Sequence, residues 1–91
     1  HLIPIEVEVD TLEQLEQALD AGVSLVLLDN MSPETLSQAV AMCQGRAKTE
    51  ASGGITPETV QAAASTGVDF IAMGYLTHST TALDIGLDFS A

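Results

Sequence analysis

The spacing of four polar or small residues limits the folds open to this chain. A run that predicts a β-strand ends at or beside each of Glu8, Asp29, Ser52 and Gly74, which follow one another at intervals of 21, 23 and 22 residues. A helix of about ten residues with two short loops fits each interval. The repeated unit is therefore one strand followed by one helix, and this repetition predicts parallel strands joined by right-handed crossovers.

Apolar runs of two kinds locate the expected strands. Residues 5–9 alternate apolar with acidic side chains, as in a half-buried strand. Residues 24–28 are almost entirely apolar, as in a parallel strand that is buried on both faces. The expected strands are 5–9, 24–28, 47–52, 68–73 and a short final strand within 83–89.

Capping residues mark three expected helices. Asp10 and Glu13 form a capping-box pattern, and Ser32 is followed by Pro33 at the first helical position. Thr56 begins the third helix in the same way, and glycines at positions 22, 45 and 67 end the three helices. The apolar side chains expected to face the core are Leu12, Leu15, Leu19, Leu36, Ala39, Val40, Cys43, Val60, Ala63 and Ala64.

A length of 91 residues allows at most one small domain. A complete (β/α)₈ barrel needs roughly 250 residues, so the strand–helix units of this chain supply about half of one. We therefore predict an α/β fold with parallel strands, a partial (β/α) barrel amounting to about half of a TIM-like barrel, in one incomplete domain over residues 1–91. The open edges of such a sheet need another segment to cover them.

The charge of the chain excludes one class of partner. Thirteen acidic residues stand against two basic ones, Arg46 and Lys48, which gives a formal net charge of −11. A nucleic-acid partner is excluded because neutralising phosphates requires clustered Lys and Arg. Arg46 and Lys48 are expected to cap the carboxyl end of the second helix. A highly anionic small substrate would need positive charge from Mg²⁺, from helix N-termini or from another chain segment.

The sequence predicts neither a membrane-spanning helix nor a disulfide. No apolar run reaches the ~20 residues that a membrane-spanning helix needs, and no signal-peptide pattern is present, so no membrane partner is expected and the cytoplasm is the expected location. Cys43 is the single cysteine, which excludes an internal disulfide. It lies on the apolar side of the second helix, so we expect it to contribute to packing.

The candidate site lies where the strands end, because ligands of parallel α/β sheets bind beyond the carboxyl ends of the strands. Glu8 and Asp29 would lie on neighbouring strands. Their oxygens suit sugar hydroxyls, or Mg²⁺ held partly through water. The alternative is a pair of solvated strand ends with no ligand. Glu6 and Glu50 each precede a strand-end residue by two positions, so we expect them deeper on the same face.

Small residues follow the third and fourth strands. Ser52, Gly53 and Gly74 suit a phosphate cradle, because a small-residue turn before a helix N-terminus leaves backbone N–H groups unpaired. His78 could donate a hydrogen bond to the same phosphate. The alternatives are a tight connection at Ser52–Gly54 and an ordinary surface histidine at position 78.

Taken together, four motifs resemble a known family over essentially the whole chain. They are Ile5-Glu6-Val7-Glu8-Val9, Leu27-Leu28-Asp29-Asn30-Met31-Ser32, Glu50-Ala51-Ser52-Gly53-Gly54 and Met73-Gly74-Tyr75-Leu76-Thr77-His78-Ser79. Their order and content resemble the C-terminal part of quinolinate phosphoribosyltransferases. The resemblance implies that residues 1–91 are the C-terminal half of that enzyme's α/β barrel.

The resemblance also implies a reaction and roles. Such enzymes join quinolinate to phosphoribosyl pyrophosphate with Mg²⁺, and release CO₂ and pyrophosphate to give nicotinate mononucleotide in NAD biosynthesis. Glu8 and Asp29 resemble the catalytic acidic pair that faces the ribose hydroxyls and the metal. The group around the ribose phosphate is represented by Ser52, Gly53, Gly74 and His78. The intact enzyme would be a homodimer or a higher homo-oligomer, because the N-terminal domain of one subunit helps to complete its partner's site.

The sequence departs from the family pattern in two ways, and two other interpretations of it are open. Tyr75 occupies a position where the family usually has Ala, and the Arg/Lys cluster that grips quinolinate is missing from these 91 residues, so we expect the chain alone to be inactive. The first rival is another phosphate-binding barrel enzyme that acts on phosphosugars. The second is a non-catalytic half-barrel that serves as an association module.

Overall fold

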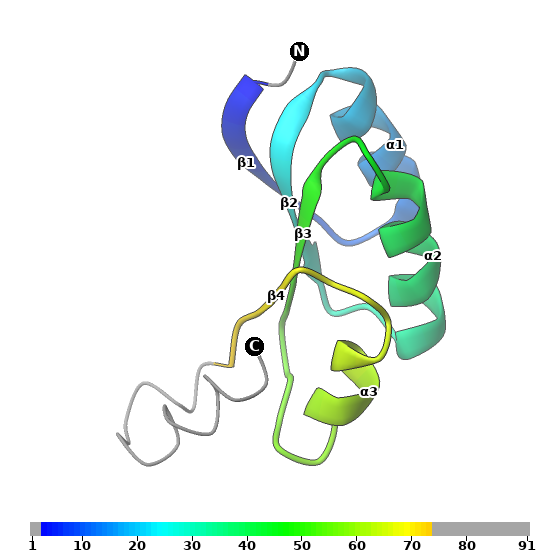
Figure 1. Ribbon diagram of the computed structural model, residues 1–91, viewed down its shortest axis with the longest axis vertical. Helices are drawn as coiled ribbons and strands as arrows, with labels where there is room; N and C mark the ends of the chain where they lie inside the picture. Colours follow the sequence, from blue (N-terminus) through cyan, green and yellow to red (C-terminus); the bar gives the residue numbers. More distant parts are fainter. Residues whose placement is uncertain (1–2, 74–91) are drawn as a thin grey trace.

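The computed structural model describes residues 3–73 as a parallel sheet with helices between its strands (Figure 1). The strands are β1 (Ile3–Val9), β2 (Val23–Asp29), β3 (Lys48–Ser52) and β4 (Phe70–Ile71). The helices are α1 (Leu12–Asp20), α2 (Pro33–Cys43) and α3 (Val60–Ala64). The sheet order is β1-β2-β3-β4 and every pairing is parallel. The predicted α/β fold with parallel strands is confirmed.

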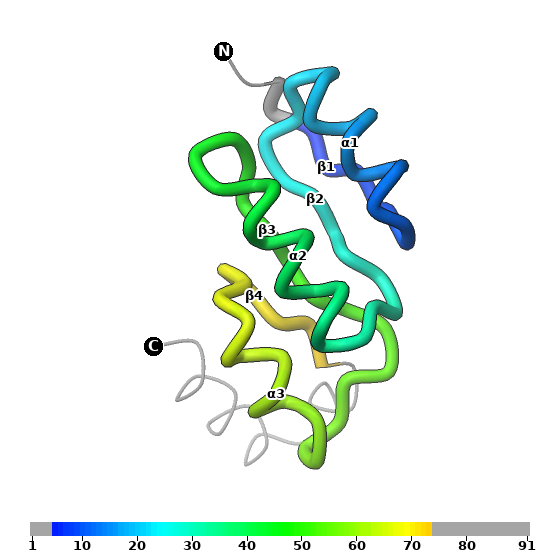
Figure 2. The backbone as a smooth tube through the Cα atoms, turned by 90° about the vertical axis from the view of Figure 1, so that its right-hand side faces the viewer, coloured from blue at the N-terminus to red at the C-terminus, as the bar shows by residue number. Residues whose placement is uncertain are grey.

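All three helices of the described part lie on one face of the sheet. Figure 1 shows the sheet nearly edge-on with the helices to one side, and Figure 2 shows the same helices in front of the strands. Sequential strands joined by crossovers of one hand produce this arrangement. The opposite face, which we call the open face, has no helix of residues 3–73 over it. None of the described helices is long and apolar enough to cross a membrane.

The core lies between the sheet and the helices. Val9, Leu28 and Ala51 stand in register on adjacent strands and are all buried. Val23 and Val26 of β2 are also buried, and the helices contribute Leu15, Leu19, Leu36, Ala39, Val40, Cys43, Val60 and Ala63 among others. Most of the predicted core is thereby confirmed, with Leu12 and Ala64 only partly buried.

The side chains of the open face alternate with those of the core. Glu8 is in register with Leu27, which is in register with Glu50, and Glu50 is in register with Phe70. Side chains of register partners project to the same face of a parallel sheet. This row is exposed or only partly buried, whereas the buried row containing Leu28 projects to the helices.

The first helix has its cap one residue later than the capping-box pattern predicted. Thr11, not Asp10, is the N-cap, and its hydroxyl accepts a hydrogen bond from the Gln14 backbone N–H at 3.1 Å. The Gln14 side chain in turn accepts from the Asp10 N–H at 2.8 Å. Thr11 is the cap because it has the extended backbone that an N-cap requires, and the Gln14 side chain bonds to the residue before the cap, not to the cap itself. The Ser32–Pro33 start of α2 is confirmed, with the Ser32 hydroxyl accepting from the Thr35 N–H.

The third helix begins later than predicted. Thr56 was expected to start it, but α3 begins at Val60. The Thr56 N–H donates to the Thr59 hydroxyl at 3.0 Å, and the Thr59 N–H donates to the Thr56 carbonyl at 3.0 Å. The Val60 N–H also donates to the Thr56 carbonyl, at 2.9 Å, so this turn leads directly into the regular helix that starts at Val60.

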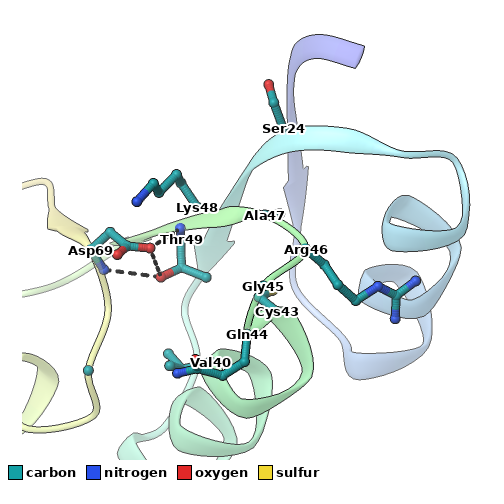
Figure 3. Close-up of a pocket in the computed structure, with 11 residues that line it drawn as sticks. Ser24, Val40, Cys43, Gln44, Gly45, Arg46, Ala47, Lys48, Thr49 and Asp69 are labelled. Carbon is teal, nitrogen blue, oxygen red and sulfur yellow. Dashed lines mark hydrogen bonds between the residues drawn. The ribbon is translucent and has the colours of Figure 1, made fainter. Parts of the chain in front are cut away.

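The fourth strand is shorter than predicted, and Asp69 provides the reason (Figure 3). Its carboxylate accepts hydrogen bonds from the Thr49 N–H at 2.8 Å and from the Thr49 hydroxyl at 3.1 Å. The Asp69 N–H donates to the same hydroxyl at 3.1 Å. Side-chain bonds therefore replace ladder bonds where β3 and β4 first meet. The strand expected within 83–89 lies outside the described residues.

We expect the 91-residue chain by itself to self-associate or to unfold at low denaturant. The chain exposes Ile5 by 49% and, on the open face, Phe70 by 51%, and β1 and β4 are the edges of the described sheet. Light scattering after size exclusion measures the association, and a urea titration measures the stability.

Cys43 offers a built-in probe for the same experiment. Burial is the largest influence on its thiol and raises the pKa. The positive charge of Arg46 lowers this pKa by a smaller amount, and the negative charge of Asp69 raises it further. A thiol that is buried and protonated reacts slowly, so the rate of labelling reports the opening of the core. A monomer that keeps Cys43 protected in several molar urea would contradict the expectation.

Candidate functional site

The carboxyl ends of β2 and β3 lie next to each other at one end of the sheet. Asp29 and Ser52, the last residues of these strands, are in register, and both are partly buried. The Asn30 N–H donates to the Ser52 carbonyl at 3.1 Å, which extends the pairing one residue beyond the strands. A carboxylate and a hydroxyl from different strands are thus side by side on the open face.

Glu8 lies on the same face but deeper than expected. Its register partner is Leu27, two residues before Asp29, so Glu8 and Asp29 do not occupy equivalent strand-end positions. One strand spacing and two residues of rise separate their Cα atoms by about 8 Å. The Glu8 side chain is exposed on the open face, in the row that also contains Leu27 and Glu50, one row below that of Asp29.

Gly53 allows the Asp29 carboxylate to lie over the β3 turn. A β-carbon on Gly53 would collide with Asp29 Oδ1 and would come within 2.8 Å of Asn30 Oδ1. Its φ of 81° is also in the left-handed region, which favours glycine. Both features require glycine here, and they place the Asp29 carboxylate directly against the backbone of the small-residue turn.

Asn30 belongs to this site, although the sequence analysis assigned it no role. Its φ of 55° makes it the only non-glycine residue with positive φ in the described part of the chain. Its side-chain amide donates to Asp29 Oδ2 at 3.4 Å. The available signal was an Asn directly after a buried strand, since Asn tolerates the left-handed conformation better than most residues.

The other predicted site residues divide into two groups. Ser52 and Gly53 come together with Asp29, whereas Gly74, Tyr75 and His78 lie outside the described residues. The helix expected directly behind the turn begins at Val60 and not at Thr56, and it has five residues. Its N-cap residue, Thr59, lines a cavity of about 260 Å³ together with Ser52, Gly53 and Gly54. Apolar side chains such as Leu28, Met31 and Leu36 line the same cavity.

Both basic residues lie at the start of β3, at the end of the sheet opposite Asp29 and Ser52. Lys48 begins β3, and Arg46 forms an exposed ion pair with Asp20 at 3.5 Å. Their predicted role as caps of α2 is wrong, because Arg46 reaches across to α1 instead. Figure 3 shows the two side chains pointing apart beside a cavity of about 290 Å³. Neither cation therefore neutralises the acidic residues at the carboxyl ends of the strands.

The carboxylates at the carboxyl ends of the strands could supply only part of the coordination shell of a metal ion. Within residues 3–73, no group of three His, Cys, Asp or Glu side chains is close enough to enclose an ion. Mg²⁺ often takes one or two carboxylates and completes its shell with water and substrate phosphate oxygens. Asp29 and Glu8 fit that partial mode of coordination.

This fold and this site define a class. Parallel strand–helix units in sequential order, with every described helix on one face of the sheet and polar groups at the carboxyl ends of the strands, are typical of part of a (β/α) barrel. The family model for the C-terminal domain of quinolinate phosphoribosyl transferase matches residues 1–88. The chain belongs to this family, as its four motifs predicted.

Individual relatives agree with the family match. A probable carboxylating nicotinate-nucleotide pyrophosphorylase of Bacillus subtilis is 46% identical over 88 residues, which cover 97% of this chain and 30% of that protein. The carboxylating nicotinate-nucleotide pyrophosphorylase of Mycobacterium leprae is 48% identical over 89 residues, 94% of this chain and 31% of that protein. The solved nicotinate-nucleotide pyrophosphorylase of Francisella tularensis has a TM-score of 0.71 at 45% identity, over 74% of this chain and 24% of that one. The chain thus spans about a third of the length of the curated relatives it matches.

A chimaera supplies the rest of such a protein for experiments. In it, the 91-residue chain replaces the matching segment of the Bacillus subtilis relative. Gly53→Ala and Gly45→Ala form a matched pair, because both glycines have positive φ and a β-carbon on Gly45 meets nothing within 4 Å. We expect each to lower the free energy of unfolding by about 1–2 kcal/mol. Only Gly53→Ala should lower pyrophosphorylase activity, since Asp29 must rotate away from the added methyl group.

Urea titration and an assay of nicotinate mononucleotide formation measure the two effects. Equal loss of activity in both variants would show that backbone strain, and not the displacement of Asp29, is responsible.

Proposed function

We propose that this segment forms the ribose-phosphate side of an active site that joins quinolinate to phosphoribosyl pyrophosphate. The products are nicotinate mononucleotide, CO₂ and pyrophosphate. One observation supports this most strongly: the Asp29 carboxylate lies in register with the Ser52 hydroxyl and against the backbone of Gly53. A carboxylate and a small-residue turn in contact can bind a sugar hydroxyl and the phosphate attached to the same sugar.

The chemistry of the transfer needs carboxylates near the sugar. Departure of pyrophosphate builds positive charge on the ribose ring, and a nearby carboxylate stabilises that charge electrostatically. Asp29 is proposed to act at the rim and Glu8 from the row below it. Mg²⁺, which Asp29 and Glu8 would hold partly through water, would neutralise charge on the departing pyrophosphate. Ser52 and Gly53 are proposed to hold the ribose phosphate, together with Gly74 and His78.

The distribution of charge supports a divided site. Both substrates are anionic, while Arg46 and Lys48 lie at the far end of the sheet from Asp29. The cations that bind quinolinate must therefore come from outside residues 3–73. We propose that they come from the preceding part of the enzyme and from a second subunit of a homo-oligomer. The cytoplasmic location remains a prediction.

The roles of the two carboxylates can be tested in the chimaera. Glu8→Gln and Asp29→Asn should each lower kcat/KM by about 10²-fold or more, equivalent to ~2.7 kcal/mol of transition-state stabilisation. The loss is expected because an amide cannot balance the positive charge of the transition state. Formation of nicotinate mononucleotide is the measurement. Glu16→Gln, on the exposed surface of α1, is the matched control and should keep full activity.

Two outcomes would contradict the proposal. One is retention of at least half of the activity by both Glu8→Gln and Asp29→Asn. The other is a folded but inactive chimaera, since the segment would then fail to supply its half of the site. Turnover by the purified 91-residue chain alone would show that the site is not divided.

Ser52 offers a test of the phosphate contact without backbone strain. Ser52→Ala should raise the Kd for phosphoribosyl pyrophosphate about 10-fold, because it removes one hydrogen bond to a charged group. The Kd for quinolinate should change much less. Isothermal titration of each ligand into the chimaera makes the comparison, with Ser37→Ala on the exposed side of α2 as the control. An unchanged affinity for phosphoribosyl pyrophosphate would remove Ser52 from the phosphate site.

A further inference from the structure

We propose that Asn30 is a positioning residue, which holds the Asp29 carboxylate in its working orientation over the turn at Gly53. This inference rests on the proposed function, because it assumes that Asp29 faces the sugar. Asn30 itself need not contact the substrate. Three features of the described residues carry the proposal: the backbone of Asn30, the hydrogen bond of its amide and the space over Gly53.

The backbone places two consecutive side chains at the same spot. Along a strand, neighbouring side chains project to opposite faces. The left-handed conformation of Asn30, with φ of 55°, ends that alternation directly after Asp29. The Asn30 N–H meanwhile donates to the Ser52 carbonyl at 3.1 Å, which anchors the residue to the end of β3. Asp29 and Asn30 can therefore both reach the turn at Gly53.

The side chain of Asn30 contacts Asp29 directly. Its amide donates to Asp29 Oδ2 at 3.4 Å, while Asp29 Oδ1 lies over Gly53. The two carboxylate oxygens thus have different surroundings, one against an amide and one against the glycine. Asp29 is only partly buried, and no cation of residues 3–73 lies at this edge to orient it. Asn30 is the one side chain in the described part that donates a hydrogen bond to it.

A simpler role for Asn30 is that of a turn residue whose side chain is irrelevant. Glycine adopts positive φ without strain, so Asn30→Gly keeps the backbone and removes only the amide. Asn30→Asp keeps the shape of the side chain but replaces the donor with a second carboxylate beside Asp29. The two variants separate the turn from the orientation of the carboxylate.

The experiment measures kcat, KM and urea stability of both variants in the chimaera. Asn30→Gly should lower kcat about 10-fold to 100-fold with little change in KM for quinolinate, because a misaligned group costs rate more than binding. Asn30→Asp should lose at least as much, since like charges would push Asp29 away. The stability of Asn30→Gly should match that of the unsubstituted chimaera. Gln61→Gly, on the exposed surface of α3, is the control for a mutation to glycine and should keep its kcat.

A double-mutant cycle with Asp29→Asn tests whether Asn30 acts on kcat through Asp29 or only supports the structure. If Asn30 acts through Asp29, then Asn30→Gly should cause no further loss of kcat in the Asp29→Asn background. Full activity of Asn30→Gly, or an undiminished loss in that background, would overturn the proposal.

The activity of the unsubstituted chimaera tests the proposed function, and the activity of Asn30→Gly tests the role of Asn30. An inactive, folded chimaera without substitutions contradicts the proposed function, whereas an active chimaera that tolerates Asn30→Gly contradicts only the role of Asn30.

Discussion

The candidate site depends on the register between β2 and β3. Because Asp29 is paired with Ser52, a carboxylate and a hydroxyl project side by side from the ends of two strands. The bond from the Asn30 N–H to the Ser52 carbonyl continues this register into the loops. A slip of one residue would turn Asp29 toward the helices, where Leu28 and Ala51 are now buried. The burial of those two side chains therefore also fixes the orientation of Asp29.

The two faces of the sheet have opposite physical requirements. The helical face is a dry core of strand and helix side chains, and it holds the strands in place. The open face carries Glu6, Glu8 and Glu50 beside apolar side chains such as Leu27 and Phe70. Carboxylates that face the interior of a barrel need partners of opposite charge or hydrogen-bond donors. The acidity of this segment is thus explicable as one side of an interior whose other side lies elsewhere in the enzyme.

Much of the fold was predictable because its signals are local. The period of about 22 residues, the Ser32–Pro33 helix start and the apolar stripes of α1 and α2 each depend on neighbours within a few positions. The errors arose where polar side chains compete with the expected backbone bonds. The Thr59 hydroxyl accepts from the Thr56 N–H in a turn that precedes α3, and Asp69 bonds to Thr49 in place of a strand ladder. Such competition depends on distances that a residue pattern does not contain.

The sequence by itself determined the strand–helix repeat, the acidic character of the chain and the family to which it belongs, because periodicity, charge and motif content are properties of residue order. Only the tertiary structure decided that Asp29 is level with Ser52 and that Glu8 lies one row deeper, since register is a relation between strands distant in sequence. It also decided that Asn30 reaches Asp29 and that Arg46 pairs with Asp20. The first contact depends on the left-handed backbone of Asn30 at the end of β2, and the second brings together residues 26 positions apart because α1 and the segment after α2 pack side by side.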